Sequence, residues 1–405
     1  MNTTQVVGMV FVGLLAFGVV LIGGAYFYGH LNADKVLAND ARRQAAKHRY
    51  PQVTLAGTAI LIACYKGEGT IAATVSYARK TGCPVYVVID GPGDRSAEIA
   101  EQAGAEVLAL PENGGKPAAL WKAYHHFDLS KRFAAVAILD DDVMIESDLI
   151  DRALEIFTPE VAIVVGKNIT WWPKELRWNV WLAVRAYSYW SYQLITRRVQ
   201  SWFNVMNCIS GSNSVYRTEL LDEVLGRPVR YIVDDTQWVL DTHRMKLGKI
   251  RYAPRAHAYL QDPTNFKEWY HQNMRWLKGT VQGIIGHKVG RSWTWFDFAY
   301  CTLILHWIVY VMSAPLTAWI VWQVWSANPL ILVYAFVGYL AWTVIVAIAL
   351  RRIELLVLFP AIVVVDYIYR WIFVVATIKA IRQPTVEVCR WDSPTRIAMT
   401  TQEMR

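Results

Sequence analysis

Carboxylates at three points of the chain are the residues best suited to bind a metal ion or to transfer a proton. Three aspartates in a row begin at Asp140, so Asp140 and Asp142 stand one residue apart after an apolar run. Two carboxylates at this spacing offer the hard oxygen ligands that Mg²⁺ or Mn²⁺ prefers, and diphosphate oxygens of a substrate can supply the rest. Asp90 ends a second apolar run, and Asp235 is the second of two adjacent aspartates. A carboxylate apart from the metal ligands is the kind of group that takes a proton from an attacking hydroxyl.

Cationic and aromatic residues complete this set. Gln272, Arg275 and Trp276 form a Q-x-x-R-W sequence, and Lys116 follows two glycines. Cationic groups stabilise a departing diphosphate, glycines before a helix allow the backbone to approach phosphate closely, and an aromatic face suits the apolar face of a sugar ring. Each motif alone is commoner as a solvated turn or a helix surface. Together, in this order along one α/β pattern, the motifs indicate a functional site much more specifically than any one of them does alone.

Short apolar runs must position these residues. They alternate with helix-length segments such as 69–81 and 116–127, a pattern typical of a parallel sheet covered on both faces. Ligands of such sheets bind at the carboxyl ends of the strands, and Asp90 and Asp140 both lie at that end. The runs are Gly57–Cys64, Cys83–Asp90, Glu106–Leu110 and Ala134–Asp140.

The composition indicates a protein that meets a membrane. Hydrophobic residues make up 54% and charged residues 18%, with 19 Trp and 21 Tyr, and aromatic side chains of this kind are enriched at bilayer interfaces. The net charge of +8 suits anionic lipid headgroups or a phosphorylated substrate, and no basic run or motif indicates nucleic acid. The uncharged run Val6–Tyr28 is long enough to span a bilayer. Basic residues after it predict an outside N-terminus and a cytosolic catalytic region.

Later stretches are predicted to meet the membrane in different ways. Phe298–Leu350 has no charged residue and predicts two spanning helices. Leu355–Ile378 is interrupted by Pro360 and can span, re-enter or lie in the interface; basic residues of the tail favour an interfacial helix and a cytosolic end. Glu175–Trp202 and Phe266–Trp293 mix aromatic and basic residues, which predicts helices in the membrane interface. Ordinary amphipathic core helices are the alternative for both.

With these motifs the sequence resembles the membrane-embedded family 2 glycosyltransferases, the processive group of hyaluronan, chitin and cellulose synthases. The resemblance covers roughly residues 53–288. It implies an α/β domain of the glycosyltransferase-A type (Rossmann-like), cytosolic, with interfacial helices and α-helical transmembrane segments, in a multi-pass protein of the plasma membrane. It also implies inverting transfer from a UDP-sugar with Mg²⁺ or Mn²⁺, and elongation and export of a polysaccharide. The predicted regions are a transmembrane anchor (1–28), a basic linker (29–52), a donor half (53–165), an acceptor half (166–293), a transmembrane region (294–380) and a tail (381–405).

The same resemblance assigns roles to single residues. The segment Ala63–Glu68 is similar to the family's opening P-x-Y-N-E, although Lys66-Gly67 replaces Asn-Glu. The segment Cys208–Arg217 is similar to C-x-S-G-P-x-x-x-Y-R, with Ser212 where proline is common, and Trp391–Arg396 is similar to the C-terminal W-x-x-x-x-R of hyaluronan and chitooligosaccharide synthases. The implied donor-binding residues are Tyr65, Glu68, Asp90 (toward the nucleoside), Lys116, Asp140, Gln272 and Arg275. The others are Asp140 and Asp142 for metal, Ser210, Gly211 and Trp276 for the acceptor, and Asp235 as the general base.

Two other interpretations stay open on the sequence. Ceramide glucosyltransferases resemble this chain too, with one N-terminal anchor and a Q-x-x-R-W, and their acceptor is a lipid; the segments around Ser210 and Arg396 favour a polymer. A transporter or channel would carry its ionisable residues within its spans, whereas here they lie between them. The expected partners are a UDP-sugar, a glycan or lipid acceptor and membrane lipids, and no pattern indicates an oligomeric state.

Overall fold

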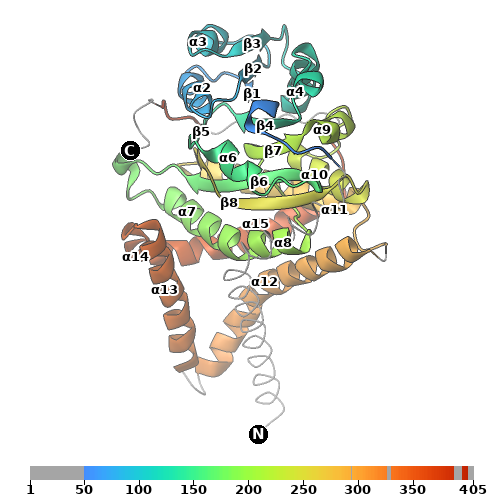
Figure 1. Cartoon of the computed structure of the whole chain (residues 1–405). Helices are drawn as coiled ribbons and strands as arrows, with labels where there is room; N and C mark the ends of the chain where they lie inside the picture. The colour runs from blue at the N-terminus through green and yellow to red at the C-terminus, as the bar shows by residue number, and fades with distance from the viewer. Residues whose placement is uncertain (1–49, 293, 326–329, 387–394, 400–405) are drawn as a thin grey trace.

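The computed structural model of the protein describes residues 50–292, 294–325, 330–386 and 395–399. The predicted anchor Val6–Tyr28 and Trp391 of the C-terminal motif lie outside the described residues. The central feature of the described part is a sheet with helices on both faces, and a second group of helices packs below it in the view of Figure 1.

The described residues form one eight-stranded sheet in the order β3-β2-β1-β4-β7-β6-β8-β5. β1 to β4 pair in parallel, as the sequence predicts. β7 runs antiparallel to both β4 and β6, and β5 runs antiparallel to β8, so the predicted parallel sheet is in fact mixed. The strands are β1 (Thr58–Cys64), β2 (Val85–Ile89), β3 (Glu106–Ala109), β4 (Ala135–Asp140), β5 (Val143–Ile145), β6 (Val161–Thr170), β7 (Asn213–Arg217) and β8 (Lys249–Leu260).

Strand β7 shows why the second half of the sheet gave no clear sequence pattern. Its five residues are buried although Asn213, Ser214 and Arg217 are polar. Hydrogen bonds satisfy them: Ser214 Oγ donates to the Ser210 carbonyl at 2.6 Å and Arg217 Nε donates to the Val161 carbonyl at 2.6 Å. A buried strand with satisfied polar groups is stable, but it lacks the apolar run that marks β1, β2 and β4.

Helices cover both faces of the sheet. Residues of α2, α3 and α6 share one apolar core with one face, and residues of α4, α9 and α10 share a second core with the other. This is the layering that brings loops after the parallel strands to one edge (Figure 1). The helices here are α2 (Ile71–Arg79), α3 (Ser96–Gln102), α4 (Lys116–His126), α5 (Leu129–Arg132), α6 (Leu149–Leu154), α9 (Thr218–Val224) and α10 (Asp234–Arg244).

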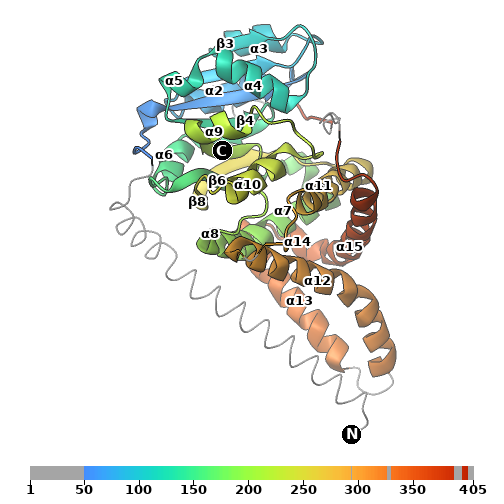
Figure 2. The same cartoon turned by 90° about the vertical axis from the view of Figure 1, so that its right-hand side faces the viewer.

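A second helical group lies on the far side of β8 from strands β1 to β4 (Figure 1). Apolar residues of α7, α11, α13 and α15 form a core of their own, and α12 and α13 extend away from the sheet (Figure 2). The elements are α7 (Val180–Tyr192), a π-helical turn (Gln193–Arg197), α8 (Arg198–Phe203), α11 (Phe266–Gly286), α12 (Trp295–Trp325), α13 (Leu330–Leu350), α14 (Glu354–Val357) and α15 (Phe359–Arg382), with 3₁₀ turns at Leu55–Gly57 and Lys174–Leu176.

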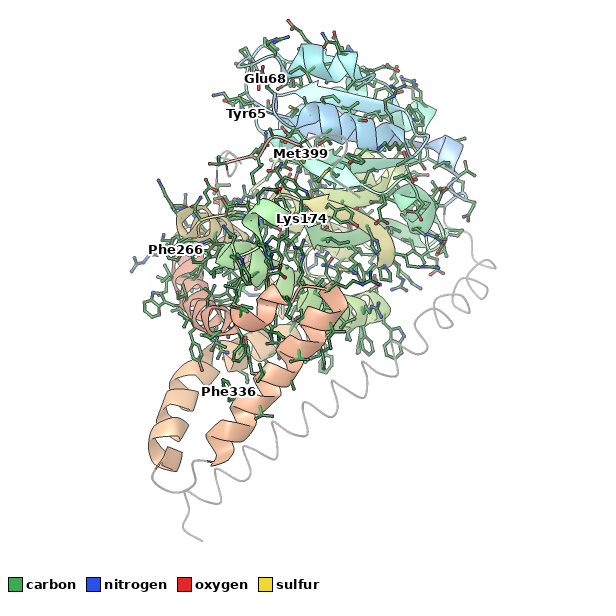
Figure 3. The ribbon with its side chains drawn as sticks, turned by 90° about the vertical axis from the view of Figure 1, so that its left-hand side faces the viewer. Tyr65, Glu68, Lys174, Phe266, Phe336 and Met399 are labelled. Atoms are coloured by element: carbon green, nitrogen blue, oxygen red, sulfur yellow. The ribbon has the colours of Figure 1, made fainter. Side chains whose placement is uncertain are left out.

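Two described helices are long and apolar enough to cross a membrane, Trp295–Met312 within α12 and Phe359–Arg382, which is α15; Phe336–Leu350 is a shorter apolar helix. The predicted break between two helices in 298–350 is confirmed, since α12 ends at Trp325 and α13 begins at Leu330. The predicted interruption near Pro360 is confirmed, since α14 ends at Val357 and α15 begins at Phe359. Pro360 lies in the first turn of α15, where a missing N–H costs no hydrogen bond. Phe336 is 56% exposed on the projecting part of α13 (Figure 3).

Candidate active site

A cavity of about 1070 Å³ begins at the carboxyl ends of β1, β2 and β4. Asp90, Lys116 and Asp140 line its sheet end, and Asp366 and Phe373 of α15 line its other end. Between them lie residues of α7 and α11. The sheet edge and the candidate membrane helices therefore open into one space.

Asp90 organises a loop at the sheet end. It is 4% exposed, and its carboxylate accepts the N–H groups of Gly114 at 2.8 Å and Gly115 at 2.9 Å. Gly91 has a φ of +93°, and a Cβ there would lie 2.6 Å from the backbone nitrogen of Asn113, so only glycine fits this close approach. Gly115 is followed by Lys116, the first residue of α4. Asp90 thus fixes the loop that presents Lys116.

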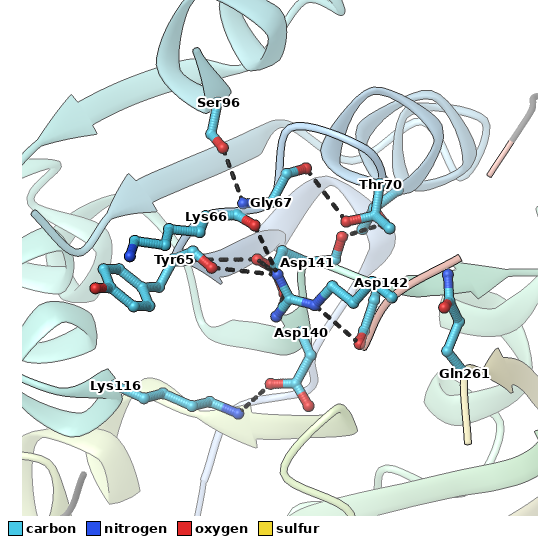
Figure 4. Close-up of polar contacts among 12 residues, drawn as sticks. Tyr65, Lys66, Gly67, Thr70, Ser96, Lys116, Asp140, Asp141, Asp142 and Gln261 are labelled. Carbon is cyan, nitrogen blue, oxygen red and sulfur yellow. Dashed lines mark hydrogen bonds and ion pairs between the residues drawn. The ribbon is translucent and has the colours of Figure 1, made fainter. Parts of the chain in front are cut away.

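Lys116 and Asp140 form an ion pair at the centre of the sheet edge (Figure 4). Lys116 Nζ also donates to the carbonyl of Gly211 at 3.0 Å. Burial by itself would lower the pKa of Lys116, but the neighbouring carboxylates, Asp140 first and then Asp234 and Asp235, together outweigh it and hold the pKa above its ordinary value. A fixed ammonium at this position offers a positive charge to any anion that enters beside Asp140.

The C-terminal segment brings a second cation to this edge. Arg396 pairs with Asp141 at 2.6 Å and approaches Asp142 at 3.4 Å. Asp141 is 2% exposed and also accepts the N–H of Tyr65 at 3.2 Å. Met399 lies near Tyr65 and Glu68 in Figure 3, and its N–H donates to the carbonyl of Gly69 at 3.1 Å. Burial, reinforced by the charge of Asp141, raises the pKa of Asp142 to about 7.

Asp235 lies across the cavity at the start of α10. Its Oδ2 accepts the N–H of Gly211 at 3.1 Å, the same residue whose carbonyl accepts from Lys116. Asp235 is half-buried, whereas Asp234 is 5% exposed. Burial, then the charge of Asp234, raises the pKa of Asp235 to about 7, against the lowering effects of Lys116 and Arg275. A carboxyl with such a pKa can take up and release a proton near neutrality.

The Q-x-x-R-W residues lie on α11 and are held by a residue that the sequence analysis did not select. Arg185 of α7 is 4% exposed, and its guanidinium lies 4.6 Å from the ring centre of Trp276 and 5.1 Å from that of Tyr189. It donates to Gln272 and pairs with buried Asp262 at 3.2 Å. Arg185 thus fixes Gln272 and Trp276 together, through a fork of donors that only arginine has.

Arg185 and Asp262 carried only a weak signal in the sequence. A single charge within the apolar segment Val180–Tyr192 is unusual in a buried helix, but it resembles the other arginines of an interfacial segment. Asp262 follows β8, the strand that the apolar runs did not reveal. Burial raises the pKa of Asp262 to about 6, and the charge of Arg185 opposes this.

Most of the predicted site residues share the cavity. Glu68 is the exception: it is exposed on the loop before α2 and accepts the N–H of Arg95 at 3.4 Å, outside the lining. Ser210 is 6% exposed, and its hydroxyl contacts Ser212 at 2.9 Å and accepts from Asn168 at 3.0 Å. The lining includes Tyr65, Asp90, Lys116, Asp140, Asp142, Ser210, Gly211, Asp235, Gln272, Arg275 and Trp276.

The sheet edge at Asp140 fits a divalent cation only together with further ligands from a bound molecule. Among the described residues no three His, Cys, Asp or Glu side chains are grouped so as to hold a metal. Asp140 and Asp142 have side chains 38% and 20% exposed, so both can offer oxygens to the cavity. Two carboxylates are the protein share that Mg²⁺ or Mn²⁺ commonly takes when phosphate oxygens supply other ligands.

Comparison with known proteins agrees with this chemistry. The family model described as glycosyltransferase like family 2 matches residues 56–279, more than half of the chain. Hyaluronan synthase 3 of Xenopus laevis is 26% identical over 198 residues, 46% of this chain and 34% of that protein. Poly-beta-1,6-N-acetyl-D-glucosamine synthase of Staphylococcus epidermidis is 24% identical over 271 residues, 64% of this chain and 62% of that protein. The chain thus spans less than two thirds of the length of these curated relatives.

Solved structures with a similar fold include glucosyl-3-phosphoglycerate synthase from Mycobacterium tuberculosis, crystallised with Mn²⁺, uridine diphosphate and phosphoglyceric acid. The two sequences are 15% identical, the TM-score is 0.39, and the match covers 60% of this chain and 84% of the other.

Proposed function

The chain belongs to glycosyltransferase family 2, and from that premise we propose that it transfers sugar from a UDP-sugar to a growing polysaccharide at a membrane. The supporting observation is the single cavity that joins the sheet edge to α12 and α15. The donor would enter at Asp90, Lys116 and Asp140, and the acceptor at Asp235 and Trp276. The relatives named hyaluronan and poly-N-acetylglucosamine synthases support a polymer product.

Donor binding would use the charges of the sheet edge. Asp140 and Asp142 would hold Mg²⁺ or Mn²⁺, which supplies positive charge to the diphosphate when bound. Lys116 would move its ion pair from Asp140 to a phosphate oxygen, since its ammonium already lies in the cavity. Arg275 would add a second positive charge as the diphosphate leaves. Asp90 would keep the loop before Lys116 in place and face the nucleoside.

Transfer would proceed from the opposite side of the sugar. The acceptor hydroxyl forms a bond to the anomeric carbon while the bond from that carbon to the diphosphate oxygen breaks. The hydroxyl proton passes to Asp235, and UDP leaves with the electron pair of the broken bond. The pKa of Asp235, about 7 because of burial and the charge of Asp234, suits this exchange. Attack opposite the leaving group inverts the anomeric configuration.

The far part of the cavity supports a path for the product. Trp276 stacks on Tyr189 with ring centres 6.5 Å apart, and both line the cavity, as do Trp307 and Tyr310 of α12. Aromatic faces bind sugar rings without fixing their direction of travel. We infer that the polymer moves from Trp276 toward α12 and α15, with the catalytic domain on the cytosolic side.

A lipid acceptor is the second candidate, and one observation favours it. The membrane end of the cavity also has apolar walls, including Leu303, Ile362 and Val365, which suit an acyl chain as well as a sugar. In that case the enzyme would add one sugar to a lipid and secrete nothing.

Product extraction separates these two functions. Purified full-length protein in lipid nanodiscs would be incubated with radiolabelled UDP-sugars and Mn²⁺. We expect label that stays in the aqueous phase and grows in length with time. Label that passes into organic solvent after a single addition would support the lipid acceptor and contradict the polymer. Label that remains entirely in intact UDP-sugar, with none in a polymer or a lipid, would contradict glycosyl transfer itself.

A further inference from the structure

A second cavity, about 720 Å³ in volume, shares no lining residue with the candidate active site. It lies where the end of α10, the beginning of β8 and the beginning of α12 meet, with Lys246, Lys249 and Trp295 among its walls. Trp295 is also the first residue of a candidate membrane span. The cavity is therefore at the level where α12 would enter a bilayer, and sugar transfer gives it no role.

The lining of this second cavity carries more positive than negative charge. Arg244, Lys246 and Lys249 lie there with one acidic residue, Glu160. Two pairs give the wall a fixed shape: Arg244 donates twice to Asp297 at 2.7 Å, and Lys249 pairs with Glu160 at 2.7 Å. Lys246 is exposed at the rim. Asp297 and Glu160 offset two of the three positive charges, so a small anion would meet a partly preorganised surface with a net charge of +1.

An uncharged wall lies behind these basic residues. His243 stacks on Phe296 with ring centres 4.4 Å apart, and both line the cavity. Burial lowers the pKa of His243 to about 4, so the ring is neutral at physiological pH, and its Nε2 contacts the carbonyl of Met206 at 2.9 Å. The site is thus basic toward the outside and aromatic within.

A row of exposed aromatic side chains continues from the mouth of the cavity. Trp202, Phe203, Trp295 and Phe298 are 36%, 42%, 56% and 67% exposed. Neighbours in this row touch: the ring centres of Phe203 and Trp295 are 5.9 Å apart, as are those of Trp295 and Phe298. Trp295 Nε1 also donates to the carbonyl of Phe203 at 3.1 Å, which joins α8 to α12. Aromatic rings in such rows lie at the headgroup level of a bilayer.

We propose that the second cavity binds the headgroup of an anionic phospholipid, with the acyl chains along the aromatic row. This inference rests on the membrane position of α12 that belongs to the proposed function. The aromatic row decides between a lipid and free phosphate, because a soluble anion would gain nothing from four exposed rings that continue into a candidate span. A lipid bound there would link α8, α10 and α12, and would anchor the catalytic domain at a fixed height.

Lipid retention tests the proposal directly. Full-length protein in nanodiscs of phosphatidylcholine with a series of phosphatidylglycerol fractions would be released and examined by native mass spectrometry. Lys246→Ala is the test variant, and Lys122→Ala, an exposed lysine on α4, is the matched control. A basic residue near an anionic membrane contributes about 1 kcal/mol, so we expect about fivefold weaker phosphatidylglycerol retention in Lys246→Ala and no change in Lys122→Ala.

Further arms make the outcome decisive. Trp295→Ala should weaken retention of phosphatidylglycerol without changing binding of inorganic phosphate. Equal retention in Lys246→Ala and Lys122→Ala would overturn the site. Tight binding of inorganic phosphate to lipid-free protein in detergent that Lys246→Ala abolishes would overturn the lipid as its occupant. Sugar transfer measured in the same nanodiscs keeps the two claims apart. Wild-type protein that retains the lipid but transfers no sugar would contradict the proposed function and leave the lipid site standing.

Discussion

Two aspartates at opposite sides of one cavity differ in how the protein holds them. Asp90, on the donor side, accepts two backbone N–H groups, at 2.8 and 2.9 Å. Asp235, on the acceptor side, accepts one from Gly211 and lies beside Asp234, and its pKa is raised by burial first and then by that neighbour. A carboxylate fixed by two backbone donors is suited to hold a loop. A carboxyl that binds its proton more tightly is suited to exchange it, so environment separates the roles of identical side chains.

The surrounding charges differ in the same way. On the donor side, Lys116 pairs with Asp140, and Arg396 pairs with Asp141. In the proposed function, an entering diphosphate and a metal ion would exchange partners with these paired groups. On the acceptor side, Arg185 and Asp262 form a buried pair that stabilises the positions of Gln272 and Trp276. The ion pairs of the donor side would change partners when substrate binds, whereas the buried ion pair of the acceptor side would keep its partners.

The largest expected effect comes from the acceptor side. Asp235→Asn keeps the shape of the side chain and removes its ability to take a proton, and general-base contributions are typically about 10² to 10⁴-fold. Transfer rates from radiolabelled UDP-sugar should therefore fall by that factor. Asp234→Asn is the internal control and should lose less, because Asp234 is more deeply buried than Asp235. If Asp234→Asn is the inactive variant, the base has been assigned one residue too late.

The donor side should be sensitive to metal. Asp142→Asn replaces a hard anionic ligand with a neutral amide, and transfer should fall by at least about tenfold. EDTA should reduce wild-type transfer in the same way, and added Mn²⁺ should restore it. Asp128→Asn, at an exposed ion pair with Lys131, is the matched control and should change nothing. Full wild-type activity in EDTA would exclude a metal role for Asp140 and Asp142.

Arg185→Lys tests whether the buried ion pair of the acceptor side acts separately from the donor side. Lysine keeps the charge but loses the fork that reaches Gln272 and Asp262 and stacks between Tyr189 and Trp276. A buried hydrogen-bond partner left unsatisfied costs about 1–3 kcal/mol. We expect the KM for the acceptor to rise about tenfold through Trp276, and the affinity for UDP to fall by a smaller factor through Gln272, a predicted donor contact. A loss of UDP affinity as large as the rise in acceptor KM would show that Arg185 supports both sides equally.

The pH dependence tests the same carboxyl without any substitution. Asp235 must be ionised to act as base, and its pKa is raised to about 7, so kcat/KM should fall about tenfold per pH unit below 7. The free energy of unfolding depends on pH in the opposite direction. Because the folded protein binds the proton of Asp235 more tightly than the unfolded chain does, the stabilisation from this group is fully present below about pH 4 and is lost as pH rises through 7. A transfer rate that is flat from pH 5 to 8 would contradict the assignment of Asp235.

The donor half of the fold could be predicted from the sequence because its signal is local. β1, β2 and β4 are apolar runs, and their parallel pairing brings Asp90 and Asp140 to one edge, as predicted. β6 begins with an apolar run, residues 161–165, that the sequence analysis did not use. β8 contains basic residues, and β7 contains buried polar residues that only tertiary hydrogen bonds satisfy. The sequence therefore indicated an α/β domain but not the mixed half of its sheet.

The site shows the same limit. Motifs with an ordered spacing, such as Asp140 with Asp142 and Gln272 with Trp276, could be found because spacing is visible in a sequence. The role of Arg185 could not, because it arises from contacts with residues of α11 and with Asp262. The Arg396 pair with Asp141 joins residues that are far apart in the chain. A motif at the C-terminus predicted that arginine, but only folding shows which aspartates it meets.

The most direct test of the division between the two sides is the affinity for UDP. Isothermal titration of UDP with Mn²⁺ into Asp235→Asn and Asp142→Asn, each as full-length protein in nanodiscs, compares them under one condition. The donor contacts proposed for Asp140, Asp142 and Lys116 predict that Asp235→Asn binds UDP within about twofold of wild type while transferring almost no sugar, and that Asp142→Asn binds at least about tenfold more weakly. Equal loss of UDP affinity in both variants would contradict the account.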